Sequence, residues 1–362
     1  MSMSRVELEA LDIGDLRRLA QEAGLATIKK ASIVAALSAD YRSDNGVLVA
    51  APEPNGAAPG PAPVPPSGDG VVWPEVPPAT SAVNGDYVEP PWLPELRAAA
   101  TIAHVELMGP AGSGKTLAVH HLAASLGKKL AVVTADGGLR KRDLVGQREL
   151  IGGQTVLMAA EFAAAARAGD WALIDEVNMS EPDALSWLNG LTDRPGIEGS
   201  TFQISGQTVE VHPSFRVFLT RNPGYVGTRA MNEALRDRFW SIDVPPLSGD
   251  SLAAMLQAHD VTDAYIPEAV WLIDTLYRAW EKNRISYQVS PRRALDAAQM
   301  CDQMTAGDPL KDITRKLGGE LSTFRYWLER SIVTKIDAKH DQEAVQRAIE
   351  AAWTAFRASS SD

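Results

Sequence analysis

The chain has 362 residues, 45% of them hydrophobic, a net charge of -11 and a single cysteine, Cys301. One cysteine excludes a disulfide framework within the chain and a cysteine-rich zinc site, and the acidic total argues against a surface coated with basic residues for nucleic acid. No apolar run is long enough to cross a bilayer, and the acidic, helix-periodic N-terminus does not match a signal peptide, so we expect a cytoplasmic protein with no membrane partner.

The first 41 residues show apolar side chains at helical spacing, among them Leu16, Leu19 and Ile33, which predicts a small all-α module. Residues 42–90 are then rich in proline, alanine and glycine. Few of them could build a core, so this stretch is expected to be a disordered or polyproline-like linker.

From residue 91 onward the sequence is typical of a globular protein. Strand-like runs alternate with helical stretches, which favours a parallel sheet covered by helices on both faces; the runs lie at 103–108, 130–135, 171–177, 215–220 and 240–244. After Pro245 and Pro246 we find no convincing strand. An α/β domain is therefore expected at 91–247 and a helical region at 248–362.

The motif 109-GPAGSGKT-116 fits the pattern G-x-x-x-x-G-K-[ST] between the first predicted strand and a helix expected to begin near Lys115. Glycines in such a loop let backbone N–H groups surround a phosphate, and the helix N-terminus adds partial positive charge. Lys115 would bridge the β- and γ-phosphates, and the Thr116 hydroxyl would ligate Mg²⁺. The sequence thus predicts a site for ATP and Mg²⁺, with the nucleotide contacted by Gly109, Pro110, Ala111, Gly112, Ser113, Gly114, Lys115, Thr116 and Leu117.

Acidic and amide side chains follow two later strands. Asp175, in 172-ALIDEV-177, would hold Mg²⁺, and strand alternation is expected to turn Glu176 towards the γ-phosphate. A carboxylate there can act as a general base for an attacking water. Asn222, after the run 215–220, could hydrogen-bond that water; the alternative is a turn residue before Pro223.

Together with 143-DLVG-146, 211-VHPSFRVFLTRNPG-224 and 232-NEALRDRF-239, these motifs resemble the AAA+ ATPases, and among them the dynein-related group that includes MoxR, CbbQ/NorQ, GvpN and midasin. The resemblance implies a P-loop NTPase fold with a helical lid. It implies Walker A at 109–116, Walker B at Asp175 and Glu176, and sensor 1 at Asn222. The later motif 290-SPRRAL-295 resembles the second sensor of the lid, a role that falls to Arg292, with Arg293 as the alternative.

The resemblance also implies an arginine that acts on a neighbouring subunit. Arg238, in 234-ALRDRF-239, is the arginine finger it suggests, with Arg236 as a helper. The simpler alternative is that both make surface ion pairs with acidic neighbours. A site completed in trans is incomplete in a monomer, so a homo-oligomeric ring, a hexamer, is expected.

Two segments, 148-RELIGGQTVL-157 and 201-TFQISGQTVEV-211, alternate apolar and polar residues around a glycine turn and are predicted to be hairpins. They fall where similar ATPases carry inserts that face the central pore and touch the client; simple edge hairpins are the alternative. The resemblance implies remodelling of a protein client, such as one with a von Willebrand A domain.

The segment 16–37 resembles a SAP/HeH or Rho-N-terminal-like helical module, which would bind DNA or RNA through Lys29 and Lys30. Yet residues 1–42 carry six Lys or Arg and six Asp or Glu, so their net charge is 6 − 6 = 0, which is poor for electrostatic binding to nucleic acid. Protein docking by this module is the alternative.

Three functions therefore stay open from the sequence. The first is a MoxR-like ATPase that remodels a protein client, and the second is a nucleic-acid-tethered motor or loader. The third is a nucleotide-dependent scaffold with little turnover, against which the presence of Glu176 argues. Two further features are expected to be structural: His120 and His121 would face different sides of a helix, which argues against a metal site, and Cys301 would be a small buried residue of the lid.

Overall fold

The computed structural model describes residues 41–44, 47–50, 70–80, 87–181, 185–192, 200–223, 231, 233–306 and 320–359. The chain divides into two compact units, Met1–Val64 and Pro65–Asp362. In the first unit, β1 (Tyr41–Asp44) and β2 (Val47–Ala50) form an antiparallel pair. The helical module predicted for residues 1–41 lies outside the described residues, apart from Tyr41.

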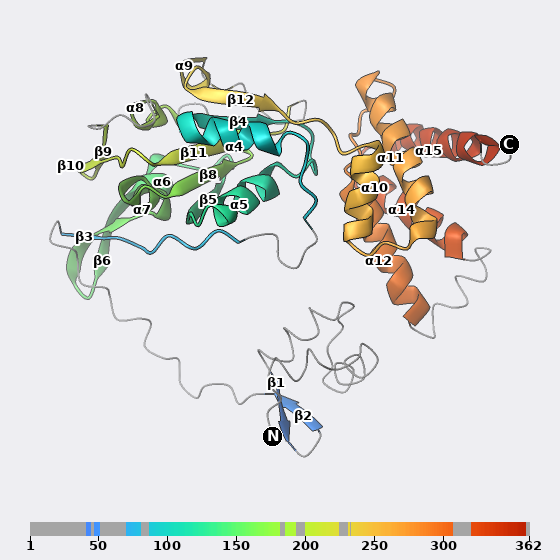
Figure 1. Cartoon of the computed structure of the whole chain (residues 1–362), viewed down its shortest axis with the longest axis horizontal. Helices are drawn as coiled ribbons and strands as arrows, with labels where there is room; N and C mark the ends of the chain where they lie inside the picture. Colours follow the sequence, from blue (N-terminus) through green and yellow to red (C-terminus); the bar gives the residue numbers. More distant parts are fainter. Residues whose placement is uncertain are drawn as a thin grey trace. The chain divides into compact units, whose positions relative to one another are not determined.

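A five-stranded parallel sheet forms the centre of the α/β part of the second unit (Figure 1). Its strands are ordered β12 (Phe239–Asp243), β4 (His104–Met108), β11 (Arg216–Arg221), β8 (Trp171–Asp175) and β5 (Leu130–Thr134). All neighbouring pairs are parallel, as predicted. Because later strands lie on both sides of β4, the strand order reverses there, and ligands of such sheets bind at the carboxyl ends of the strands.

Helices cover both faces of this sheet, because successive strand residues point to opposite sides. α4 (Leu93–Ile102) and α5 (Lys115–Ser125) share a core with one face. α6 (Lys141–Val145) and α7 (Glu161–Ala168) share a second core with the other. Burial on both faces explains why the strands read as nearly continuous apolar runs.

Both predicted hairpins are confirmed as hairpins. β6 (Gly146–Ile151) pairs with β7 (Gln154–Ala159), and β9 (Thr201–Ile204) pairs with β10 (Gln207–Glu210), each antiparallel. The two central residues of each turn have φ between 46° and 91°. Two positive φ values define the turn type whose twist matches that of hairpin strands, and glycine is the residue that adopts them without strain.

The second unit begins before residue 91. β3 (Val71–Val72) runs parallel to β7 and extends the β6–β7 hairpin to three strands. Val71 and Val76 are buried in the core that contains α7. Residues 70–80 are therefore packed against the domain and are not the linker that composition predicts. Two features explain this: the valines near the prolines fill sites in the core, and a short strand can pair at the edge of a sheet even beside proline.

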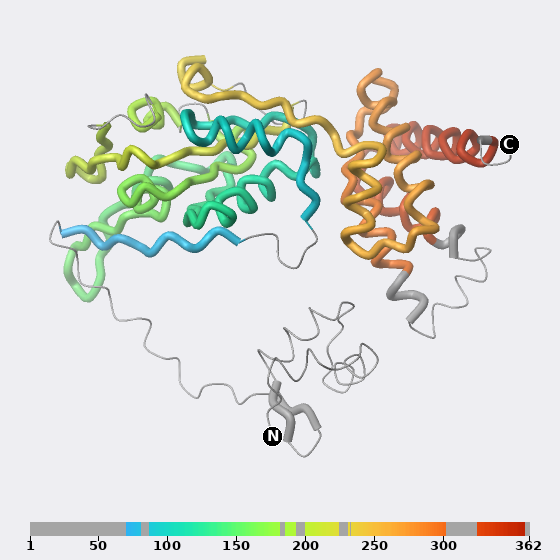
Figure 2. The backbone as a smooth tube through the Cα atoms, viewed as in Figure 1, coloured from blue at the N-terminus to red at the C-terminus, as the bar shows by residue number. Residues whose placement is uncertain are grey.

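The remainder of the second unit is helical among the described residues, as predicted for residues after Pro246. The lid helices are α10 (Gly249–Ala258), α11 (Ile266–Glu281), α12 (Arg292–Ala306), α14 (Glu320–Val333) and α15 (Lys339–Ser359). Figure 2 shows the chain passing from β12 into these helices. They enclose a core of their own, in which Cys301 is buried as expected.

Short helices complete the described chain: η2 (Val177–Met179), α8 (Leu188–Leu191), α9 (Glu233–Arg236) and η4 (Asp263–Tyr265). Within the described ranges, none of the helices has the combination of length and apolar character that crossing a membrane requires.

Candidate active site

The glycine-rich loop lies between β4 and α5, at the carboxyl edge of the sheet. Gly112 and Gly114 have φ of 78° and 83°, and Gly114 precedes the first residue of α5, Lys115. A Cβ built on Gly112 would come within 2.6 Å of the Ser290 Oγ in the lid. The loop therefore needs glycine at this position for its backbone conformation and for the close approach of the lid.

Lys115 is buried, and its ammonium group is held by the loop itself. Lys115 Nζ donates to the carbonyl oxygens of Gly109 at 2.9 Å and Pro110 at 2.7 Å. Burial lowers the pKa of Lys115 to about 8, while the carboxylates of Asp175 and Glu176 act in the opposite direction. Phosphate oxygens could therefore replace these two carbonyl oxygens as the hydrogen-bond acceptors of Lys115.

Asp175 ends β8 and is held between two hydroxyl groups. Thr116 Oγ1, in the first turn of α5, donates to Asp175 Oδ1 at 2.9 Å. Thr220 Oγ1, at the end of the neighbouring strand β11, donates to the same oxygen. Thr220 is a site residue that the sequence analysis did not assign, although its place at the carboxyl end of a central strand was a usable signal.

The oxygen donors Thr116 and Asp175 fit Mg²⁺, a hard cation that takes one or two protein oxygens and completes its coordination with water and phosphate oxygens. The described residues include no group of three or more His, Cys, Asp or Glu side chains that could enclose a metal ion. A Mg²⁺ site that shares its ligands with a nucleotide requires no such group.

Glu176 leaves the strand in a left-handed backbone conformation, with φ of 56° and ψ of 40°. Its backbone N–H donates to Thr220 Oγ1 at 2.9 Å, and Asn222 Nδ2 donates to its Oε1 at 3.3 Å. The different direction of Glu176 comes from this turn; the expected strand alternation does not apply, because β8 ends at Asp175. A non-glycine residue with positive φ is uncommon and is found at functional sites.

Asn222 follows β11 directly and is placed by contacts on both sides. Asn178 Nδ2, in η2, donates to the carbonyl oxygen of Asn222 at 3.0 Å. The Oδ1 atoms of both asparagines are buried without a protein partner. Unpaired buried amide oxygens are costly, so the site has acceptor capacity that a water molecule or ligand could use.

A pocket of about 570 Å³ joins these groups and is bounded by both the α/β domain and the lid. Thr116, Asp175, Glu176 and Asn222 line it, together with Arg292 at the start of α12. Arg293 lies next in sequence, but its guanidinium pairs with Asp296 Oδ2 at 2.9 Å. Of the two arginines considered for the second sensor, Arg292 is thus the one that reaches the pocket.

A second part of the pocket lining, the apolar wall, comes from segments that carry none of the predicted motifs. They are the strand-like stretch at Thr80, residues 87–92, residues 245–247 and the lid side chains Met255, His259 and Leu295. His120 also lines the pocket, and burial lowers its pKa, with Asp175 acting in the opposite direction. These residues carry no motif, so only the fold brings them together.

Arg238 lies outside this pocket. Its guanidinium donates to the carbonyl oxygen of Ala234 in α9, and Arg236 is exposed. β12, which follows, is the edge strand of the sheet. The arginine predicted as the finger therefore lies beside the edge strand of the sheet, outside the pocket that its own chain's phosphate loop lines.

The parallel sheet, the glycine-rich loop before α5 and the acid at the end of β8 define a P-loop nucleotide-binding protein. Residues 104–239 match the family described as AAA domain, dynein-related subfamily. The uncharacterized protein YojN of Bacillus subtilis is 30% identical over 253 residues, which cover 68% of this chain and 77% of YojN. The uncharacterized protein SH1500 of Staphylococcus haemolyticus is 29% identical over 254 residues, which cover 68% of this chain and 89% of that relative. The chain belongs to the dynein-related AAA domain family, which indicates an ATPase-type P-loop NTPase.

Proposed function

We propose that this protein is a MoxR-like ATP hydrolase that works as a ring, a hexamer, and remodels a protein client. The observation that carries the proposal is the convergence of Lys115, Thr116, Asp175, Glu176 and Asn222 on one pocket that the lid closes with Arg292. A scaffold would need the phosphate-binding groups, but it would not need a carboxylate oriented by an amide beside them.

Each side chain has a distinct role in the proposed reaction. Lys115 exchanges its two carbonyl acceptors for phosphate oxygens, and the backbone N–H groups of the loop bind the same phosphates. Thr116 and Asp175 would hold Mg²⁺, which when bound would neutralise part of the phosphate charge. Glu176 accepts the proton of the attacking water, and Asn222, which already donates to the Glu176 carboxylate, keeps base and water aligned.

A ring explains the position of the arginines. Arg292 acts on the nucleotide of its own chain, since it lines the same pocket as Thr116. Arg238 acts on the nucleotide of the adjacent copy, where it stabilises charge that develops during phosphoryl transfer. The general tendency of AAA proteins to oligomerise supports this arrangement.

The two hairpins are proposed as the client-contacting surface. Arg148 Nη2, in β6, donates to the carbonyl oxygen of Ser205 in the turn of β9–β10 at 3.5 Å, so the hairpins lie side by side. Leu150, near the β6–β7 turn, is 75% exposed. An exposed leucine beside the turn is suited to an apolar contact with an unfolded or extended client segment.

The proposal is tested by trapping the client. Tagged Glu176→Gln, which should bind ATP without cleaving it, is held in Mg-ATP with and without nuclease and compared with Lys115→Ala under the same conditions. A protein that co-purifies with Glu176→Gln and not with Lys115→Ala is the expected result. Recovery of DNA-metabolism proteins that nuclease treatment removes would favour the nucleic-acid-tethered motor, and equal recovery by both variants would contradict client remodelling.

A further inference from the structure

Residues 70–80 form a strap along the α/β domain, and its first part belongs to the β6–β7 hairpin. Val71 and Val72 pair in parallel with Leu157 and Met158 of β7. Both valines are buried. The hairpin therefore includes the strap as its third strand, and the pairing fixes where the base of the hairpin lies.

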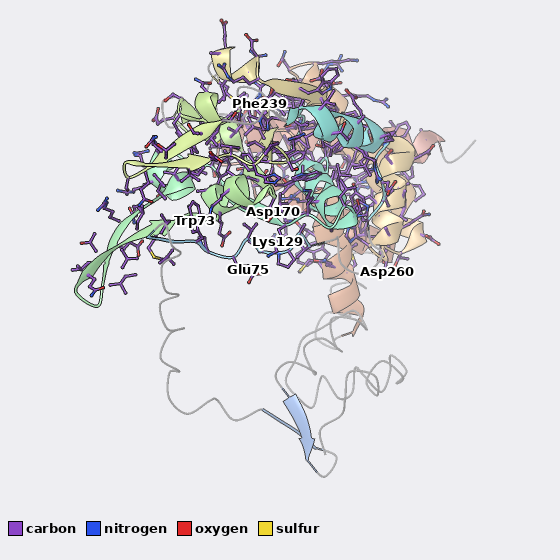
Figure 3. The ribbon with its side chains drawn as sticks, turned by 60° about the vertical axis from the view of Figure 1, so that its left-hand side comes forward. Trp73, Glu75, Lys129, Asp170, Phe239 and Asp260 are labelled. Atoms are coloured by element: carbon purple, nitrogen blue, oxygen red, sulfur yellow. The ribbon has the colours of Figure 1, made fainter. Side chains whose placement is uncertain are left out.

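The middle of the strap is held by side chains on the body of the domain. The Trp73 ring lies 4.6 Å from the guanidinium carbon of Arg167 in α7, and Glu75 Oε1 pairs with Lys129 Nζ at 2.9 Å. Figure 3 shows Glu75 beside Lys129, with Trp73 further along the same segment. Val76, which follows Glu75 directly, is buried. Each exposed contact is weak by itself, so the seating of the strap depends on several of them together.

The strap then crosses the edge of the sheet at β5. The backbone N–H of Leu130 donates to the carbonyl oxygen of Pro77 at 3.0 Å, and Pro78 forms an antiparallel bridge with Lys129. Val76 belongs to the core on the α7 face, whereas Ala79 packs against the core on the α5 face. The strap thus covers an edge strand and joins the two faces of the sheet.

The strap ends at the pocket. Thr80 Oγ1 lies 3.3 Å from His120 Nδ1, and both residues line the pocket. His120 stands four residues after Thr116 on α5, and side chains with this spacing lie on the same face of a helix. One continuous segment of eleven residues therefore has one end in the hairpin and the other against a residue one turn from Thr116.

We propose that the strap is a positioning element that couples the β6–β7 hairpin to the nucleotide pocket. Nucleotide that fills the pocket stabilises the wall formed by Thr80 and His120, and this favours the seated strap and its pairing with β7. Coupling of two binding events is reciprocal, so a strap that is seated raises the affinity for nucleotide. The proposal rests on the proposed function, because it requires that the pocket binds nucleotide.

The test uses the full chain and compares charge variants in the middle of the strap, away from the pocket. Glu75→Lys places two ammonium groups side by side, and the exchanged pair Glu75→Lys with Lys129→Glu restores opposite charges. Glu343→Lys, an exposed residue of α15, is the matched control for the change in charge. Amide hydrogen exchange is measured for residues 70–80 and 154–159 with and without Mg-ADP or a non-hydrolysable ATP analogue.

Nucleotide is expected to slow exchange in both segments of the wild-type chain. Glu75→Lys is expected to raise the KM for ATP about two- to fivefold, the range for an exposed ion pair, with kcat unchanged. The exchanged pair returns KM towards the wild-type value, and Glu343→Lys leaves it unchanged. Trp73→Ala, which removes the ring over Arg167, is a second variant with the same expected direction, and Trp73→Phe retains most of the effect of the ring.

Two results would overturn the coupling. One is nucleotide binding by the wild-type chain that protects residues 109–116 and leaves residues 70–80 and 154–159 unaffected. The other is faster exchange of the strap in Trp73→Ala with an unaltered KM. If the wild-type chain bound no nucleotide, the proposed function would fail and the coupling would fail with it. If it bound nucleotide but gave either of the two results above, the coupling alone would fail.

Discussion

The two ends of the pocket are built differently. At the phosphate end, polar groups are connected by hydrogen bonds: Lys115 to the loop, Thr116 and Thr220 to Asp175, and Asn222 to Glu176. At the apolar wall the lining is rich in proline and large hydrophobic side chains, with Tyr87, Val88, Pro90, Pro91, Trp92, Pro245, Pro246, Leu247, Met255 and Leu295. One end is suited to charge and proton transfer, and the other to a flat, less polar part of a ligand.

This difference has a consequence for how each end tolerates change. The phosphate end is preorganised, because every group is oriented by another group of the same network. Loss of one member leaves its hydrogen-bond partner unpaired and no longer held in place. The apolar wall is assembled from several separate segments, each contributing contact area. We therefore expect changes at the phosphate end to act on kcat by orders of magnitude and changes at the wall to act on KM by small factors.

The largest effect is expected for Arg238, the arginine that we propose each chain supplies to the nucleotide of its neighbour. Arg238→Ala should lower kcat by about a thousandfold or more, the range for an arginine supplied in trans, while nucleotide affinity stays close to that of the wild-type chain. Steady-state ATPase assays and equilibrium nucleotide binding measure the two quantities. Mixed rings of Arg238→Ala with Lys115→Ala should regain activity at shared interfaces, and full activity of Arg238→Ala alone would contradict completion in trans.

The second prediction concerns the pH dependence of nucleotide binding. Burial lowers the pKa of Lys115 to about 8, and phosphate binds the protonated ammonium. Affinity should be constant below pH 8 and fall above it by up to about tenfold per pH unit, because binding must then include uptake of a proton. Calorimetric titration from pH 7 to 10 measures this slope.

The same pKa determines a change in stability with the opposite direction. The unfolded lysine keeps its proton up to its ordinary pKa of 10.5, so between about pH 8 and 10.5 the unfolded chain binds more protons than the folded chain. This group therefore makes the free energy of unfolding rise with pH in that window. Lys115→Met should remove both trends, and a pH-independent affinity in the wild-type chain would show that nucleotide binding does not include uptake of a proton by Lys115.

The third prediction separates the adjacent arginines of the lid. Arg292→Ala should reduce kcat/KM about tenfold or more, because a charge-assisted contact to phosphate is lost. Arg293→Ala should change kcat/KM by less than about twofold, since its guanidinium pairs with Asp296 on the same helix. Comparable losses in the two variants would contradict the assignment of the second sensor to Arg292.

The two ends also differ in how far the sequence predicts them. Lys115, Thr116 and Asp175 belong to motifs whose local context, strand followed by loop followed by helix, is itself visible in the sequence. Thr220 could have been included, because it lies near the carboxyl end of β11, the strand beside that of Asp175. The orientation of Glu176 could not, because alternation along a strand does not reveal where the strand stops.

The apolar wall could not be predicted, because its residues are brought together only by tertiary contacts. The same holds for the strap that leads to Thr80: Val71, Val72 and Val76 lie in a stretch whose composition is typical of a linker, and their burial depends on the open edges of β7 and β5. The divergence of His120 and His121 on the helix argues against a metal site, but it does not bear on whether His120 lines a nucleotide pocket.

The smallest effect is expected at the apolar wall. Leu295, on the first turn of α12, is partly buried against the lid core and also lines the pocket. Leu295→Ala should raise the KM for ATP about three- to fivefold, corresponding to the roughly 1 kcal/mol of apolar contact that a shortened side chain loses, and should leave kcat unchanged. Leu295→Met, which conserves volume, is the control, and its KM should lie within about twofold of the wild-type value.

Thermal unfolding of both variants separates loss of ligand contact from loss of lid packing, since only the latter lowers Tm in the absence of nucleotide. A fall in kcat of tenfold or more in a Leu295→Ala chain with an unchanged Tm would mean that the wall takes part in orienting the reacting groups, and that the division of labour between the two ends is not the one proposed.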